Sequence, residues 1–77
     1  MMKPAVTVDV RRIACPPGLW VLVPALRDGE IGDVVEVLTT DPKDKDDIAT
    51  WVKKVGHEIL YVIREQDYDR IAVRKTR

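Results

Sequence analysis

The sequence contains a single cysteine and a single histidine, and this scarcity excludes several kinds of site. One cysteine cannot form an intramolecular disulfide, so we expect a cytoplasmic protein rather than a disulfide-stapled secreted scaffold. His57 has no second histidine or cysteine near it in the sequence to complete a metal site, and there is no glycine-rich phosphate loop. We therefore expect no metal and no cofactor, and we interpret His57 as a strand-edge residue that bonds to backbone.

Net charge is also lacking, because 13 lysines and arginines balance 13 aspartates and glutamates. No overall field would draw the chain to nucleic acid or to an anionic membrane. Three aspartates near residue 45 lack the spacing and closing glutamate of a calcium loop. The C-terminal basic residues could suggest nucleic-acid binding, but no aromatic platform accompanies them, so we expect no direct nucleic-acid partner. These basic residues are Arg70, Arg74, Lys75 and Arg77.

Long apolar runs are absent as well. The longest, residues 19–26, is far shorter than the roughly 20 residues of a membrane helix, and the first residues do not resemble a signal peptide, so no membrane association is expected. With 77 residues, the chain is predicted to be one domain, residues 1–77, with a thin core. A site on the surface is therefore expected rather than a deep pocket.

Hydrophobic periodicity predicts six elements. The predicted strand 57–64 is apolar on both faces across residues 59–63, which indicates a strand that is either central in the sheet or covered by another subunit. The predicted fold is α/β (α+β), a two-layer sandwich in which two helices cover one face of a four-stranded mixed sheet. The predicted order is strand 5–10, helix 16–27, strand 34–39, helix 45–55, strand 57–64 and strand 68–75.

The first predicted helix has two unusual features. Pro24 falls in its interior, where a proline should kink the helix or cut it short. The face opposite the sheet is apolar too, although a small domain has nothing left to cover it. We therefore expect this face to bind a partner, through Trp20, Val21 and Val23.

Cys15 directly precedes this helix, and a helix start favours a thiolate because free N–H groups and the positive end of the helix dipole stabilise the anion. Arg11 and Arg12 would add positive charge. Cys15 is thus a candidate acceptor of sulfur as a persulfide. The alternative is that Cys15 is a buried, inert apolar residue, as lone cysteines often are.

Residues 8–16, Val-Asp-Val-Arg-Arg-Ile-Ala-Cys-Pro, resemble the Leu-Asp-x-x-Gly-x-x-Cys-Pro signature of the TusA/SirA family of small sulfur-carrier proteins. Further similarity follows in the same order at residues 36–38, 40–42, 47–48, 51, 56–58 and 71–75. The resemblance implies the same β-α-β-α-β-β sandwich. It also implies that Cys15 carries a persulfide from a cysteine desulfurase or rhodanese to an acceptor protein, in tRNA thiolation, molybdenum cofactor assembly or sulfur oxidation.

The sequence departs from the family around the cysteine. The family has Cys-Pro-x-Pro, whereas here Gly18 follows a proline pair, which should loosen the first helical turn. Arg12 replaces the usual upstream glycine, and the helix face near Trp20 is more apolar than is common in the family, which suggests a different partner or self-association into a homo-oligomer. The residues expected around the thiol are Asp9, Arg11, Arg12, Pro16, Pro17 and Gly18.

Two function classes remain open. The first is a sulfurtransferase, an enzyme with Cys15 as its covalent carrier. The second is a non-catalytic interaction or regulatory module that acts through the apolar face of helix 16–27.

Overall fold

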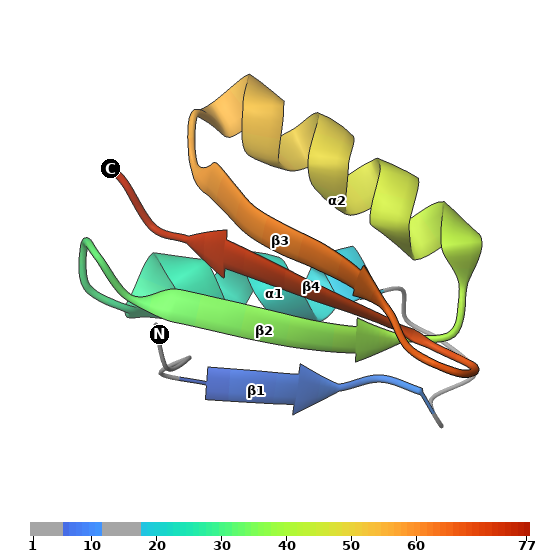
Figure 1. Ribbon diagram of the computed structural model, residues 1–77. Helices are drawn as coiled ribbons and strands as arrows, with labels where there is room; N and C mark the ends of the chain where they lie inside the picture. Colours follow the sequence, from blue (N-terminus) through green and yellow to red (C-terminus); the bar gives the residue numbers. More distant parts are fainter. Residues whose placement is uncertain (1–5, 12–17) are drawn as a thin grey trace.

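The structure is a computed structural model, and it describes residues 6–11 and 18–77 (Figure 1). Its elements follow the predicted β-α-β-α-β-β order. They are β1 (Val6–Asp9), α1 (Gly18–Asp28), β2 (Val34–Thr39), α2 (Pro42–Val55), β3 (Glu58–Arg64) and β4 (Asp69–Arg74).

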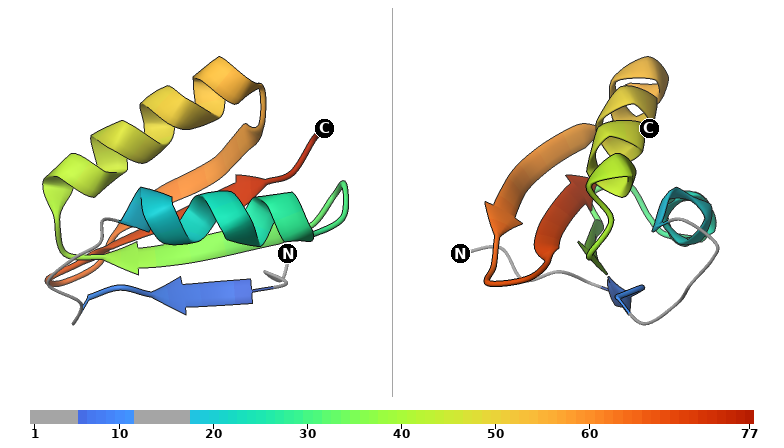
Figure 2. Two further views of the ribbon diagram at one scale, coloured as in Figure 1. Left: turned by 180° about the vertical axis from the view of Figure 1, so that it is seen from behind. Right: turned by 90° about the vertical axis from the view of Figure 1, so that its right-hand side faces the viewer.

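The four strands form one sheet in the order β1-β2-β4-β3. β1 pairs parallel to β2, whereas β4 runs antiparallel to both β2 and β3. Both helices lie on the same face of this sheet (Figure 2). The prediction of a mixed four-stranded sheet in a two-layer α+β sandwich is therefore confirmed.

β3 lies at an edge of the sheet, so the prediction that it could be central is wrong. Its apolar residues are only partly used by the core: Ile59 packs against the core, whereas Val62 and Ile63 are 45% and 41% exposed. The register shifts between Ile59 and Tyr61, which marks a bulge in this strand. The alternative, that another subunit covers β3, stays a prediction.

The core lies between the sheet and the two helices. Alternate residues of the strands face the helices, and each helix contributes two fully buried side chains. Within residues 6–11 and 18–77, neither helix is long and apolar enough to cross a membrane. The core residues are Val10, Leu22, Leu26, Val35, Val37, Ile48, Val52, Ile71 and Val73.

α1 continues through Pro24 to Asp28, so the proline does not cut the helix short. A proline at this position leaves the carbonyl four residues earlier without a donor. That carbonyl belongs to Trp20, which lies on the exposed side of α1.

α2 begins at Pro42, three residues before the predicted start. Asp41 is its N-cap, and its Oδ1 accepts the N–H of Lys43 at 2.9 Å. Pro42 suits the first helical position because its missing N–H would have no partner there. Asp41 and Pro42 thus begin the helix, and Gly56 ends it with a left-handed φ of 97°.

Candidate functional site

The predicted carrier residue Cys15 lies between β1 and α1, outside the described residues, as do Arg12, Pro16 and Pro17. The two ends of this segment are described. A Cβ placed on Gly18 would lie 3.5 Å from Cγ2 of Val10. The chain therefore leaves β1 and enters α1 at neighbouring points, at the end of the sheet where β1 and β2 terminate (Figure 1).

Gly18 is buried at the start of α1 and makes close contacts there, whereas the rest of the turn expected to be loosened lies outside the described residues. The N–H of Gly18 donates to Oδ2 of Asp44 at 3.0 Å. A Cβ on Gly18 would lie 3.1 Å from Cγ1 of Val37, closer than ordinary van der Waals contact. A proline at this position would lack the N–H, so the glycine and Asp44 form a matched pair that ties α1 to α2.

Asp44 is a functional candidate that the sequence pattern did not reveal. It is 3% exposed, in the first turn of α2. Its Oδ2 also accepts the hydroxyl of Thr39 at 2.7 Å, whereas its Oδ1 is buried with no hydrogen-bond partner among the described residues. Asp44 thus lies beneath the start of α1 with one carboxylate oxygen that no other described residue pairs.

Asp9 and Arg11, both predicted to lie near the thiol, form an ion pair just after β1. Nε and Nη2 of Arg11 donate to the two carboxylate oxygens of Asp9 at 2.9 and 2.7 Å. The guanidinium also lies over the ring of Tyr68, 4.5 Å from its centroid. The hydrogen bond that Arg11 donates to Asp9 is the main cause that raises the pKa of Arg11. The charge of Arg11 is therefore offset by a carboxylate and is not free to act on a thiolate alone.

The outer face of α1 contains fewer exposed apolar residues than predicted. Trp20 is 70% exposed, as expected for a contact residue. Val23 is half-buried, but Val21 packs against the core cluster, so placing Val21 on the outer face was wrong. Helical geometry turns Val21 by about 100° from Trp20, which is enough to bring it to the rim of the core.

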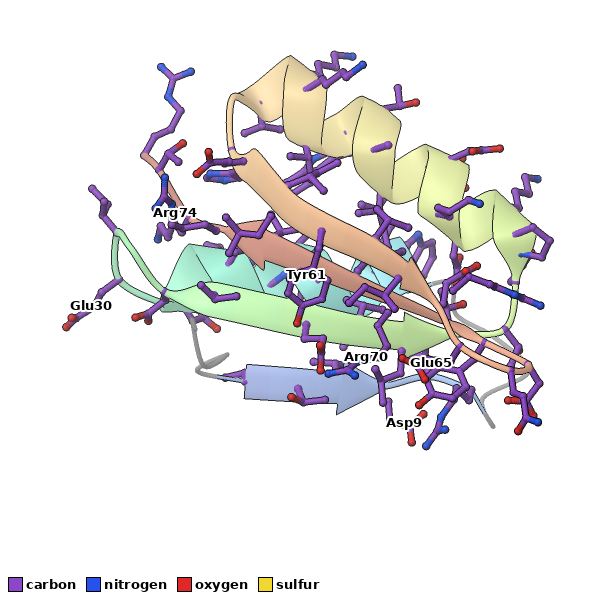
Figure 3. The ribbon with its side chains drawn as sticks, in the orientation of Figure 1. Asp9, Glu30, Tyr61, Glu65, Arg70 and Arg74 are labelled. Atoms are coloured by element: carbon purple, nitrogen blue, oxygen red, sulfur yellow. The ribbon has the colours of Figure 1, made fainter. Side chains whose placement is uncertain are left out.

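The face of the sheet that carries no helix holds a second polar cluster. Glu36 is 3% exposed and accepts hydrogen bonds from Arg70 Nη2 at 2.9 Å and from the hydroxyl of Tyr61. Figure 3 shows Tyr61 and Arg70 lying together on this face. Burial, and then the hydrogen bond to Glu36, raises the pKa of Tyr61. These contacts join β2, β3 and β4, which is a structural role.

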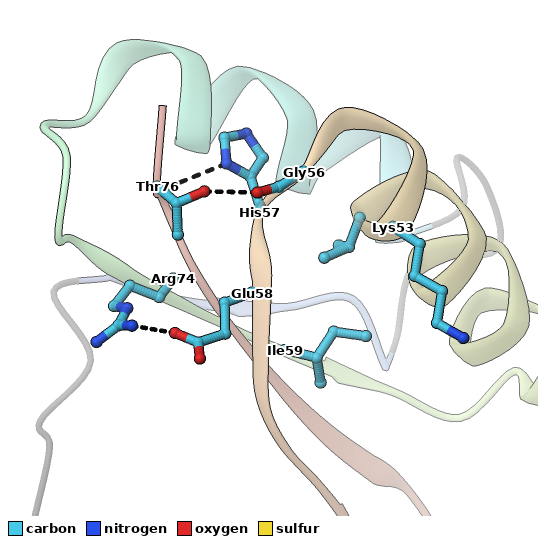
Figure 4. Close-up of a pocket in the computed structure, with 8 residues that line it drawn as sticks. Lys53, Gly56, His57, Glu58, Ile59, Arg74 and Thr76 are labelled. Atoms are coloured by element: carbon cyan, nitrogen blue, oxygen red, sulfur yellow. Dashed lines mark hydrogen bonds and ion pairs between the residues drawn. The ribbon is translucent and has the colours of Figure 1, made fainter.

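His57 lines a shallow pocket between the end of α2 and the C-terminal residues (Figure 4). Its Nδ1 accepts the backbone N–H of Thr76 at 3.2 Å, which confirms the predicted bond to backbone. Its ring lies 5.7 Å from that of Trp51. No group of three or more His, Cys, Asp or Glu side chains in the described part of the chain could hold a metal ion.

The C-terminal basic residues make contacts inside the molecule. Two of them bind carboxylates on neighbouring strands, and two donate to carbonyl groups at the ends of the helices, which is favourable at a helix C-terminus. The hypothesis of nucleic-acid binding gains no support from them. The pairs are Arg70 with Glu36, Arg74 with Glu58, Lys75 with the carbonyls of Arg27 and Gly29, and Arg77 with the carbonyl of Val55.

Two solved structures share this fold. A SirA-like protein of Desulfitobacterium hafniense gives a TM-score of 0.72 at 19% identity, and the match covers 94% of this chain and 99% of that chain. A protein of Helicobacter pylori gives a TM-score of 0.69 at 20% identity and covers 92% and 97%. The fold is therefore that of the small SirA-like α+β proteins.

Residues 6–75 match the family model described as Sulfurtransferase TusA, and the chain belongs to this family. It is 47% identical over 70 residues to a protein of Archaeoglobus fulgidus provisionally named a sulfur carrier, covering 91% of this chain and 96% of that one. It is also 33% identical over 54 residues to the Sulfur carrier protein TusA of Pseudomonas entomophila, covering 70% and 68%. These relatives support a sulfur carrier role, with protein donors and acceptors of sulfur as partners.

Proposed function

We propose that this chain is a cytoplasmic sulfurtransferase, one domain over residues 1–77, that holds a persulfide on Cys15. The observation that carries the proposal is membership of the TusA family in a chain whose only cysteine falls between β1 and α1. A donor of the cysteine desulfurase or rhodanese type supplies the sulfur, and an acceptor protein takes it. The destination is tRNA thiolation, molybdenum cofactor assembly or sulfur oxidation.

The chemistry needs only the thiol and two partners. The Cys15 thiolate attacks the outer sulfur of a donor persulfide, the donor S–S bond breaks, and its electron pair returns to the donor sulfur. An acceptor thiolate then attacks the outer sulfur on Cys15 in the same way. Cys15 is regenerated, so there is no net oxidation and the chain turns over as a catalyst.

Trp20 supplies the contact surface in this proposal. A large aromatic side chain that is 70% exposed is the kind of residue that anchors protein interfaces. It lies five residues after Cys15, so a partner that covers it would also lie near the thiol. The same exposure favours the second candidate function, an interaction module that needs Trp20 but not Cys15, and self-association would use this surface too.

The test is the intact mass of the chain after incubation with a rhodanese loaded from thiosulfate. We expect a gain of one sulfur atom in the wild type and none in Cys15→Ser. If neither protein gains sulfur from rhodanese or from a cysteine desulfurase, the carrier function is wrong. Loss of partner capture in Trp20→Ala, with cellular function intact in Cys15→Ser, would favour the interaction module instead.

A further inference from the structure

The outer side of β3 has no neighbouring strand among the described residues, because β3 pairs with β4 at the edge of the sheet (Figure 1). The backbone N–H and C=O groups on such a side can pair with a strand of another chain. Edge strands are commonly protected by proline or lysine, or by being very short. β3 is seven residues long and contains neither proline nor lysine. Its outer side is therefore open to pairing.

Two neighbouring residues of β3 expose apolar side chains on opposite faces of the sheet. Val62 pairs with the core residue Ile71, so it points to the face that carries the helices. Ile63 pairs with Arg70 and points to the other face. Both side chains are more than two-fifths exposed. An added strand beside β3 would cover both of them.

The bulge between Ile59 and Tyr61 limits the length of β3 that can pair, because a bulge bends the strand and interrupts its ladder. Regular pairing with β4 continues from Tyr61 to Arg64. The available stretch is thus about four residues, or roughly 14 Å. A contact of this length buries far less than the roughly 1,200 Å² of a stable interface, so we expect a weak complex whose amount depends on concentration.

We propose that this stretch binds β3 of a second copy of the chain, antiparallel and about a two-fold axis at Val62. Val62 then lies opposite its own copy, and Tyr61 lies opposite Ile63 of the second copy, which forms an aromatic and β-branched pair on the face without helices. β3 begins with Glu58 and ends with Arg64, so the antiparallel arrangement brings ends of unlike charge together. The formal net charge is zero, so two copies do not repel each other overall.

The proposed dimer has one continuous sheet in the order β1-β2-β4-β3-β3-β4-β2-β1. α1 packs against β1 and β2, on the side of each copy that lies away from the contact. The exposed Trp20 therefore stays accessible in the dimer. Self-association through Trp20 is a different arrangement, and the experiment separates the two. The proposal does not depend on the carrier function, since no sulfur donor or acceptor takes part.

The test is sedimentation equilibrium of the whole chain between about 10 μM and about 1 mM, a range that covers weak dissociation constants. We expect the average mass of the wild type to rise from that of one chain toward that of two. Val62→Lys places a charge in the contact and should remain monomeric. Val6→Lys is the matched control, because it adds the same charge at a valine of similar exposure on β1, the other edge strand, and it should still dimerise.

A wild type that is monomeric over the whole range would overturn the proposal. Unchanged association in a folded Val62→Lys variant, or equal loss in both lysine variants, also overturns it. Loss of association in Trp20→Ala but not in Val62→Lys would assign the contact to α1 instead. If Val62→Lys does not fold by circular dichroism, amide hydrogen exchange of the wild type decides: the amides of residues 61–64 should exchange more slowly at the higher concentration, and equal rates contradict the proposal.

Discussion

At the scale of single residues, the contacts of His57 favour the neutral form of its ring. Its Nδ1 can accept the N–H of Thr76 only while that nitrogen carries no proton. Burial, and then the positive charges of Lys75 and Arg77, lowers the pKa of His57. The neutral ring therefore fastens the C-terminal residues to the start of β3.

This arrangement predicts a pH-dependent stability. The lowered pKa means that the folded chain binds a proton less readily than the unfolded chain does. The free energy of unfolding should be highest above about pH 6.5, the ordinary pKa of histidine, and should fall as the pH drops toward the lowered folded-state value. Urea unfolding of the wild type and of His57→Gln, between about pH 7.5 and 5.5, checks this, because carboxylates titrate mainly below that range. If the free energy of unfolding changes with pH by the same amount in the wild type and in His57→Gln, then His57 is not the cause of the pH dependence.

At the scale of elements, the N-cap of α2 holds both the helix and Asp44 in place. Asp41→Ala removes the side-chain acceptor for the N–H of Lys43, and we expect the free energy of unfolding to fall by about 1 kcal/mol. Asp46→Ala changes an exposed aspartate in the interior of the same helix and should have little effect. Equal losses in the two variants, measured by urea denaturation, would mean that the cap contributes nothing specific.

The elements themselves could be predicted because their signals are local. Alternating valines and helical spacing give the order of the strands and helices. The helix that connects β1 to β2 favours their parallel pairing. Extending the spacing of Ile48 and Val52 back by four residues reaches Asp44, so an earlier start of α2 would have shown Asp44 on the buried face. The edge position of β3 could not be predicted, because apolar residues on both faces of a strand do not determine whether it pairs with one neighbouring strand or with two.

The contact that defines the candidate site is not local. Gly18 and Asp44 are 26 residues apart, so no pattern within either helix indicates that they meet. Gly18 seen alone indicates a loose turn. In the structure, Asp44 and Val37 pack so closely against Gly18 that a side chain larger than hydrogen would crowd them.

At the scale of the whole molecule, the two ends of the sandwich have different roles. The starts of both helices and the end of β1 meet at one end, where the chain also enters and leaves the segment that contains Cys15 (Figure 1). At the other end, Lys75 and Arg77 donate to the carbonyl groups that end the two helices. The C-terminal residues therefore tie the ends of both helices together at the end of the sandwich opposite the start of α1.

The most direct test of the carrier function follows one sulfur atom through a full cycle. The chain is loaded with radiolabelled sulfur by a rhodanese, separated from the donor, and mixed with glutathione as the acceptor thiol. We predict that the label leaves the chain and is recovered in equal amount as glutathione persulfide together with the sulfide that this persulfide releases with further glutathione. We also predict that the chain can be reloaded and that Cys15→Ser carries no label. Label on Cys15→Ser equal to that on the wild type, or no transfer from the loaded chain to any thiol, would contradict a carrier role for Cys15.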